Sequence, residues 1–172
     1  MHSSFILKDI SRRETLESIA ARYPEFEMSA QECFLALLSV AGHVMEAIEL
    51  QLSRHKTSQG RIRILLELQQ TSSQALAAGE LAARLKVTPA TVTGLLDGLE
   101  RAGQVRRKRC REDRRSVAVR LTARGTRVLS KVMPERFLRN SRLMAKLSEV
   151  DRRALVRLLG RVGRGLEEFS RS

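Results

Sequence analysis

Apolar residues recur at helical spacing through the first half of the chain. Residues 30–52 place an apolar side chain every three or four positions, which is the period of one helix face. The members of this stripe are Phe34, Leu37, Leu38, Ala41, Val44, Met45, Ile48 and Leu52. A second stripe, from Ile62 to Leu68, follows Thr57 and Ser58, either of which can cap a helix. The pattern therefore predicts two helices, the first with a wide apolar face.

Two shorter apolar patterns follow, with a tight turn at Lys86–Val87 between them. The segment GELAARL (79–85) has the spacing of a short helix, and KVTPATVTGLLDGLERAG (86–103) that of a longer one. In the second segment Thr88 is a predicted N-cap, because Pro89 stands at the first helical position, where a missing N–H costs nothing. Gly103 is the predicted C-terminal cap. The buried positions are expected to be Leu81, Ala82, Leu85, Val92, Leu95, Leu96 and Leu99. This pair predicts a helix-turn-helix.

Residues 116–121, SVAVRL, change the period from helical to two. Val117, Val119 and Leu121 alternate with smaller or polar residues, which is typical of a strand with one buried face. The run RRKRCREDRR (106–115) just before it holds seven basic and two acidic residues. Because this run leads directly into a strand, it predicts a hairpin rather than a tail. A helix-turn-helix followed by a basic hairpin is a winged helix-turn-helix.

The C-terminal third returns to helical patterns. One helix begins after Thr122, a predicted N-cap, and we expect Pro134 to end or kink it. The last helix begins at Ser148, with Asp151 three residues on in a capping-box arrangement. Its apolar stripe consists of Leu155, Leu158, Leu159, Val162, Leu166 and Phe169. This stripe needs a partner outside a compact core, and we expect a second copy of the chain.

The net charge of +13 is concentrated in one part of the chain. Residues 101–127 hold eleven Lys or Arg and two Asp or Glu, a net charge of +9. A field of this density suits a polyanion, because each neutralised phosphate releases condensed counterions. The basic stretch lacks the apolar helix face with which amphipathic helices bind membranes. A nucleic acid is therefore the expected partner, and a membrane is not.

The predicted fold class is mainly α: a winged helix-turn-helix core with a small β-hairpin wing lies between N- and C-terminal dimerisation helices. Residues 1–56 are expected to form an N-terminal extension and the first dimerisation helix. Residues 57–122 form the predicted DNA-binding domain, and residues 123–172 the C-terminal dimerisation helices. A helical pattern at 11–26 is expected to extend the dimer interface.

Other function classes have no support in the sequence. We expect no stretch to be apolar for long enough to span a bilayer, and the N-terminus lacks a signal-peptide core, so the protein is predicted to be soluble and cytoplasmic. Two cysteines cannot build a disulfide framework, and three scattered histidines have no metal-ligand spacing. No nucleophile elbow or phosphate loop is present. We therefore expect no cofactor, no metal site and no enzymatic activity.

Three stretches together resemble the MarR family of bacterial regulators. They are ELAARLKVTPATVTGLLDGLERAGQVRRKR, EDRRSVAVRLTARG and, more loosely, LSEVDRRALVRLLGRV. The resemblance implies a homodimer on double-stranded DNA with a pseudo-palindromic operator, each subunit placing a recognition helix in the major groove and a wing in the minor groove. It also implies a repressor released by a small-molecule effector or by oxidation. The chain departs from the family pattern at Gln104, where an apolar residue is common, and at Gly94 and Gly98, where Arg is frequent.

The predicted recognition helix has few side chains that read bases. With the apolar stripe buried, Ala90, Gly94, Asp97 and Arg101 point outward at 100° per residue. Because no Arg, Lys, Asn or Gln lies in its first half, bidentate recognition of guanine or adenine has no donor there. The expected contacts come from methyl and hydroxyl groups, with capping as the main role of Thr88. The predicted DNA-binding residues of this region are Arg84, Lys86, Thr88, Ala90, Thr91 and Thr93.

The wing is expected to supply most of the charge. The family resemblance implies that Arg115 enters the minor groove, with Asp113 orienting a neighbouring guanidinium. A narrow A·T-rich groove has an enhanced negative potential that favours such an arginine. The remaining basic residues of the wing are expected to contact phosphates. They are Arg106, Arg107, Lys108, Arg109, Arg111 and Arg114.

Two cysteines keep a redox alternative open. Cys33, followed by Phe34, resembles the position of the reactive thiol in the hydroperoxide-sensing branch of the family, although Leu37 stands where that branch has a tyrosine. A buried structural cysteine is the plainer interpretation. Cys110 lies among Arg and Lys residues that favour a thiolate. The alternatives to a ligand-released repressor are thus a thiol-based repressor of the same fold and a less specific architectural protein of DNA or RNA.

Overall fold

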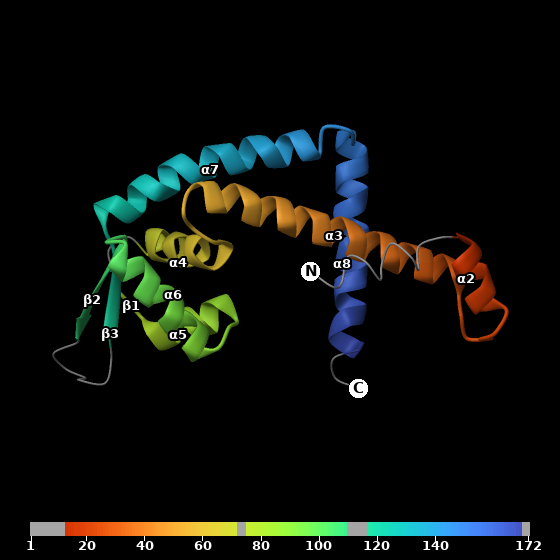
Figure 1. Cartoon of the computed structure of the whole chain (residues 1–172), viewed down its shortest axis with the longest axis horizontal. Coiled ribbons are helices and arrows are strands. Elements are labelled where there is room, and N and C mark those ends of the chain that lie inside the picture. The colour runs from red at the N-terminus through yellow and green to blue at the C-terminus, as the bar shows by residue number, and fades with distance from the viewer. Residues whose placement is uncertain (1–12, 72–74, 110–116, 170–172) are drawn as a thin grey trace.

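The computed structural model describes residues 13–71, 75–109 and 117–169 and has the predicted fold class. Helices surround a small antiparallel sheet at one end of the molecule, and long helices extend from it to the other end (Figure 1). The elements are α2 Arg13–Ala20, α3 Met28–Arg54, α4 Gln59–Gln70, β1 Leu76–Ala77, α5 Ala78–Leu85, α6 Pro89–Arg101, β2 Val105–Arg109, β3 Val117–Leu121, α7 Ala123–Leu143 and α8 Glu149–Phe169.

Three helices begin at side-chain caps that the sequence predicts. Ser58, Thr88 and Thr122 each accept a hydrogen bond from the backbone N–H three residues later, at 3.5, 3.2 and 3.1 Å. Such caps satisfy N–H groups that the first helical turn leaves without partners. The capping box of α8 is also present: Asp151 Oδ2 accepts from the Ser148 N–H at 3.0 Å, and Asp151 N–H donates to Ser148 Oγ at 3.2 Å. The predicted starts of α4, α6, α7 and α8 are therefore confirmed.

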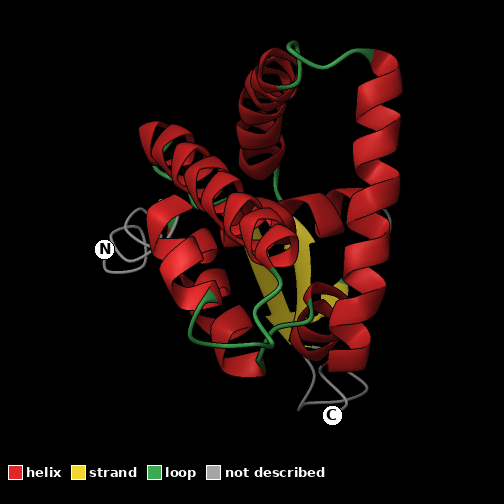
Figure 2. Ribbon diagram, turned by 90° about the vertical axis from the view of Figure 1, so that its right-hand side faces the viewer, coloured by secondary structure: helices red, strands yellow, loops and turns green. Residues whose placement is uncertain are grey.

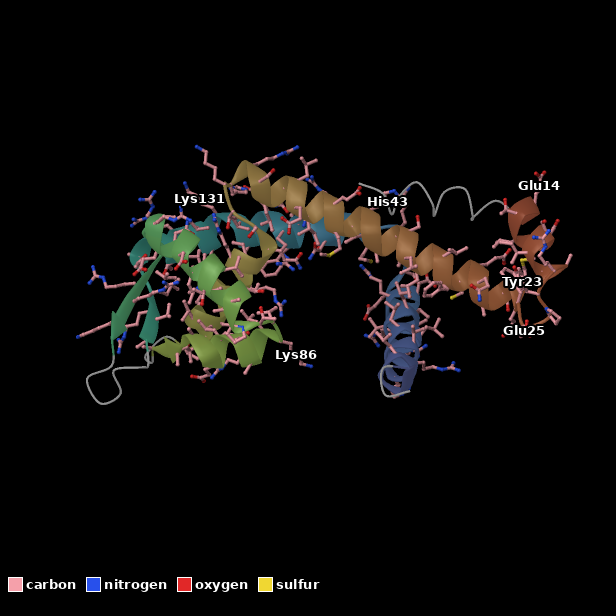
Figure 3. All side chains as sticks on the ribbon, turned by 60° about the horizontal axis from the view of Figure 1, so that its bottom comes forward. Glu14, Tyr23, Glu25, His43, Lys86 and Lys131 are labelled. Carbon is pink, nitrogen blue, oxygen red and sulfur yellow. The ribbon has the colours of Figure 1, made fainter. Side chains whose placement is uncertain are left out.

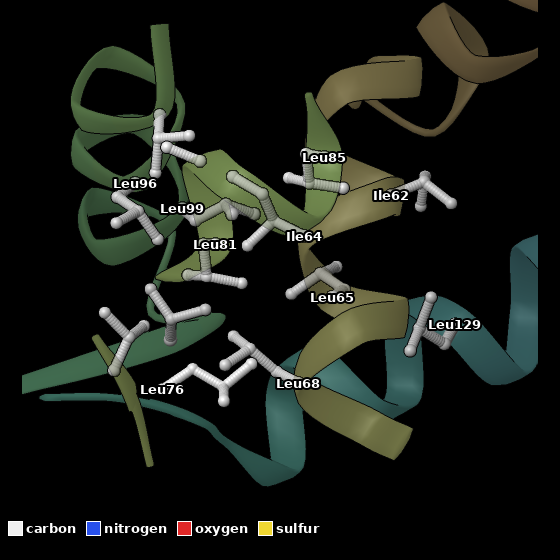
Figure 4. Packing of buried hydrophobic residues seen from close by; sticks show 14 of the residues in the cluster. Ile62, Ile64, Leu65, Leu68, Leu76, Leu81, Leu85, Leu96, Leu99 and Leu129 are labelled. Atoms are coloured by element: carbon white, nitrogen blue, oxygen red, sulfur yellow. The ribbon is translucent and has the colours of Figure 1, made fainter. Parts of the chain in front are cut away.

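One buried cluster fixes α6 against the sheet. Leucine, isoleucine and valine side chains from α4, α5, α6, the sheet and the start of α7 meet in this cluster (Figure 4). Among the predicted stripe of α6, Val92, Leu96 and Leu99 are buried, and Leu95 is half-buried. Each buried leucine contributes about 1.5–3 kcal/mol through loss of apolar surface from water. The cluster therefore makes α5, α6 and the wing one unit.

The sheet has three strands, of which the sequence predicts two. Strand β3 pairs antiparallel with β2 on one side and with the short β1 on the other. Strand β1 has only two residues, so it carries no period-two pattern from which it could be predicted. It lies between α4 and α5 in the chain and, through its pairing with β3, connects the helix-turn-helix to the wing.

Pro134 does not end α7, in contrast to one of the two outcomes that the sequence predicts. The helix continues to Leu143 and bows gently along its length (Figure 1). A proline inside a helix removes one N–H donor and crowds the carbonyl four residues before it. Because Pro134 is exposed, the carbonyl left without that donor lies near solvent, where the cost is small.

The long helices leave a wide apolar surface uncovered in the protomer. None of the described side chains of α8 is buried, and Figures 1 and 2 show this helix apart from the core. The largest exposed apolar side chains of these helices include Phe34, Leu38, Val40, Met45, Leu50, Phe137, Leu138, Val150, Val156, Leu158, Val162 and Leu166. A surface of this extent marks an interaction site.

Helix α3 is more apolar than the sequence analysis expects. By length and composition it is able to cross a membrane, which corrects the expectation that no stretch reaches that threshold. The core helices of proteins without membrane spans pass the same test, so this single helix carries little weight. Its exposed apolar side chains, such as Phe34 and Leu50, belong to the uncovered surface described above, whereas Leu52 is buried in the core.

Candidate nucleic-acid interface

The turn between α5 and α6 depends on one residue in the left-handed region. Lys86 has φ 53° and ψ 48°, and its N–H donates to the Ala83 carbonyl at 3.2 Å. A non-glycine residue pays about 1–2 kcal/mol for this conformation. The hydrogen bond from the Val87 N–H to the Ala82 carbonyl helps to hold the turn. As a result the chain reverses within a few residues and presents the N-terminus of α6, next to Lys86 (Figure 3), to solvent.

The first turns of α6 form an exposed surface of small side chains. Ala90 and Gly94 are exposed, as the sequence predicts, and Thr91 and Thr93 beside them are exposed as well. Thr91 Oγ1 lies 2.8 Å from Thr88 Oγ1, and Thr93 Oγ1 donates to the Pro89 carbonyl at 2.9 Å. These hydroxyls already have partners inside the helix, and both side chains remain exposed. A Cβ at Gly94 would meet no atom within 4 Å. The surface therefore allows a close approach of the helix to a groove.

Gly98 has a different role from Gly94, although the sequence analysis treats the two glycines together. Gly98 is buried, and a Cβ there would lie closer than 3.0 Å to Arg61 Nη2. The absence of a side chain makes room for the Arg61 guanidinium against α6. The departure from the family pattern at this position thus concerns packing of α4 on α6, not the outward face.

The basic residues of β2 alternate between two environments. Arg106 and Lys108 are exposed, and neither forms an ion pair with an acidic side chain in the described part of the chain. Arg107 lies on the other face, with a side chain that is 23% exposed. Its Nη1 donates to Asp97 Oδ1 at 2.6 Å. The sequence predicts the same phosphate contact for all of these residues, but the structure places them in two distinct environments.

The other predicted site residues differ in their surroundings. Arg84 is paired with Glu80 at 2.7 Å and lies 3.7 Å from Glu67, whereas Lys86 is exposed. Arg109 is the last residue of β2. Cys33 is exposed on α3, which corrects the expectation of a buried cysteine for the protomer. The predicted residues Cys110, Asp113, Arg114 and Arg115, together with Arg111, lie outside the described residues.

The segment LTARG (121–125) closes the base of the wing. Thr122 caps α7, its Oγ1 donates to the Gly103 carbonyl at 2.8 Å, and its N–H donates to the Gln104 carbonyl at 3.1 Å. A Cβ at Gly125 would lie closer than 3.0 Å to that same Gln104 oxygen. Gly125 is therefore required for the close approach of two backbone segments. Sequence reasoning used this motif as a family signature and missed its physical cause.

Comparison with known proteins decides the family. The MarR family profile matches residues 57–117. The HTH-type transcriptional repressor YetL of Bacillus subtilis is 31% identical over 163 residues, which cover 95% of this chain and 98% of the relative. The chain belongs to the MarR family. The HTH-type transcriptional regulator PecS of Dickeya dadantii, at 28% identity over 83% of this chain and 87% of its own, is a further relative of this MarR protein.

Solved structures carry the same fold. The MarR family transcription regulator SP03579 superposes with a TM-score of 0.73 at 19% identity, covering 84% of this chain and 96% of its own. A MepR–DNA complex of S. aureus superposes with a TM-score of 0.64 at 19% identity, over 77% and 94% of the two chains. The protein is thus a winged helix-turn-helix transcriptional regulator of MarR type, and its relatives are named as regulators rather than enzymes.

Proposed function

We propose that this MarR protein is a homodimeric, cytoplasmic repressor that binds a pseudo-palindromic operator. The observation that carries the proposal is the exposed N-terminal surface of α6, beside the exposed Arg106 and Lys108, which have no acidic partner among the described residues. A helix in the major groove places its N-terminal residues on base edges, and Ala90, Thr91 and Thr93 occupy those positions. The repressor name of the YetL relative supports the direction of regulation.

Dimerisation is the role that we assign to the uncovered apolar surface. The exposed side chains of α3, α7 and α8 form it, and all three helices reach away from the wing (Figure 1). A second copy of the chain covers this surface and sets the two α6 helices apart by a fixed distance. The boundaries of 1–56, 57–122 and 123–172 stay a prediction within this scheme.

A hollow between α3 and α7 supports release by a small ligand. It has a volume of about 500 Å³ and is lined mainly by apolar side chains, among them Val44, Ile48 and Leu143. Arg139 also lines it: its Nη1 donates to the Ala47 carbonyl at 3.2 Å, while its buried Nη2 has no hydrogen-bond partner among the described residues. An unpaired buried donor of positive charge favours an anionic group. The effector that fits is a small acid with an apolar body.

The connection between the hollow and the wing runs along one helix. Helix α7 begins directly after β3 and carries Arg139 near its other end. A ligand between α3 and α7 changes the position of α7 and with it the base of the wing. Oxidation at Cys33 or Cys110 remains the second candidate signal, favoured by the exposure of Cys33 on the same surface.

A binding series tests the proposed function. The full chain is titrated with the promoter fragments next to its own gene, with random duplex and with structured RNA, at stated salt concentrations. Preference for one promoter fragment by 10³-fold or more, the order typical of specific binders, supports the proposal. Equal affinity for all three nucleic acids contradicts it and favours an architectural protein.

Ligand release is tested with the same promoter complex. Small apolar acids are compared with their neutral amides, and we expect only the acids to dissociate the complex. Arg139→Gln removes this discrimination, whereas the control Arg157→Gln, on exposed α8, retains it. Dissociation by a thiol oxidant alone, blocked by substitution of Cys33 or Cys110, would instead identify the redox branch.

A further inference from the structure

Four contacts of one residue join β2 to α6. Besides the bond to Asp97, Arg107 Nη2 donates to the Thr93 carbonyl at 3.2 Å, and Nε lies 3.7 Å from Glu100 Oε2. The backbone N–H of Arg107 donates to Glu100 Oε1 at 3.2 Å. Positions 93, 97 and 100 follow one another at helical spacing, so Arg107 spans two turns of α6 on the side that faces the wing.

The strand register explains why this arginine, and not its neighbours, reaches α6. In the β2–β3 pair Arg107 lies opposite the buried Val119, whereas Arg106 lies opposite the exposed Arg120. Side chains alternate between the two faces of a strand. Arg107 therefore belongs to the face that packs on the helix-turn-helix, and Arg106 and Lys108 belong to the face that points away.

The contacts oppose a phosphate role for Arg107. To reach a phosphate, its guanidinium must leave Asp97 and Glu100, and two carboxylates then stay unpaired beside a polyanion. Charge-assisted hydrogen bonds are about twice as strong as neutral ones. Exchanging the bonds to the two carboxylates for one to a phosphate therefore gains little binding free energy. The neighbouring Lys108, exposed and without an acidic partner in the described chain, has no such competition.

We infer that Arg107 is a positioning residue that fixes the wing against the recognition helix and neutralises Asp97 and Glu100 on the DNA-facing side. The inference rests on the proposed function for its effect on DNA, but not for the contact itself. The recognition helix and the wing can enter the major groove and the adjacent minor groove at the same time only if the angle between them is fixed. Loss of the angle lowers specific binding, while non-specific binding, which depends on charge alone, changes little.

Hydrogen exchange on the free protein tests the contact without DNA. Arg107→Gln and Asp97→Asn are compared with Lys108→Gln, which removes the adjacent exposed charge. We expect Arg107→Gln and Asp97→Asn each to raise amide exchange in β2 and in the last turns of α6 by about fivefold, the order of a partly buried ion pair. Lys108→Gln leaves these amides unchanged. Equal exchange in all three variants overturns the inference, whatever the protein binds.

Binding to the operator tests the effect on specificity, and Asp97→Asn gives the decisive sign. Removing a negative charge from a DNA-binding surface raises affinity for all sequences if the charge acts only through repulsion. A positioning role predicts the opposite: Asp97→Asn and Arg107→Gln lower the ratio of specific to non-specific affinity by a similar factor, about fivefold. The double variant is no worse than either single variant, because both break the same contact.

The salt dependence separates Arg107 from Lys108. A phosphate contact contributes about 0.9 to the slope of log affinity against log salt concentration. We expect Lys108→Gln to lose that amount and Arg107→Gln to keep the wild-type slope, with partial rescue of specificity by Arg107→Lys through Asp97. An Arg107→Gln slope equal to that of Lys108→Gln contradicts the inference. Absence of specific binding by the wild type, with the exchange result intact, refutes the proposed function alone.

Discussion

His55 Nε2 lies 2.9 Å from Glu135 Oε2 and joins the end of α3 to the middle of α7. The hydrogen bond from His55 is the largest cause that holds the pKa of Glu135 below its ordinary value of 4.5, and the charge of Arg54 acts in the same direction. The two helices border the hollow lined by Val44, Ile48 and Leu143. This contact therefore connects the helix-turn-helix side of α3 with the helix that leads to the wing.

The pH dependence of this contact has a definite sign. Because the pKa of Glu135 is lower in the folded state, its contribution to stability is present above pH 4.5 and is lost as the pH falls through the lowered pKa. Glu135→Gln is expected to lower the melting temperature near neutral pH and to have no effect well below 4.5. Glu46→Gln, another exposed carboxylate of this region, serves as the control. A melting temperature that rises in Glu135→Gln near neutral pH would show that the contact is repulsive.

Two glycines are expected to respond oppositely to alanine. Gly125→Ala forces apart the Gln104 carbonyl and the start of α7, which costs about 1–3 kcal/mol. Gly94→Ala meets open space in a helix interior and stabilises by about 0.5–1 kcal/mol. Urea unfolding of both variants measures the two free energies. If Gly125→Ala leaves the free energy of unfolding unchanged, the two backbone segments do not approach as closely as described.

A charge in the middle of the α8 stripe is expected to break the dimer. Val162 is 50% exposed in the protomer, so Val162→Glu leaves the protomer fold intact but places a carboxylate in the proposed interface. Arg157→Glu introduces the same side chain on the opposite face of α8. Sedimentation of the two variants distinguishes them: only Val162→Glu is expected to be monomeric. A wild-type protein that is a stable folded monomer at micromolar concentration contradicts the assignment.

The helix and the wing are expected to divide the work of recognition unequally. Arg115→Ala weakens operator binding and narrows the preference for A·T-rich over G·C-rich flanks, because the narrow groove no longer receives a cation. Thr91→Ala costs only about 1 kcal/mol, since one hydroxyl contact is lost and no charge is stranded. A salt-titrated series on two flank sequences measures both effects. Loss of specific binding in Thr91→Ala, with intact flank preference in Arg115→Ala, would show that the helix contributes more to recognition than the wing.

Local signals in the sequence predicted the helix starts and the helix-turn-helix. A capping side chain acts within three residues of itself. The caps at Thr88, Thr122 and Ser148–Asp151 can therefore be predicted from the sequence without knowledge of the tertiary structure. Strand β1 was not predicted, because two residues carry no periodicity. The sequence predicts that Pro134 ends or kinks α7, but its exposed position lowers the cost of the lost hydrogen bond.

The sequence predicts where the basic site lies but not which of its residues are exposed and which pack on α6. Composition marks 106–115 as basic and does not separate Arg107 from Lys108, because both are cations in one run. Their separation arises from the register with β3 and from acids ten and seven residues earlier on α6. The role of Gly98 likewise depends on Arg61, a residue of another helix. Such pairings are set by tertiary packing.

Footprinting of the full chain on its own promoter tests the central claim, that two copies of α6 and the wing read a symmetric operator. The account predicts two protected half-sites in inverted repeat, with centres about 34–36 Å apart, one turn of the duplex, because the protein two-fold sets their spacing. Minor-groove protection by the wings is expected just outside each half-site. Protection of a single asymmetric half-site, or of no defined site, contradicts it.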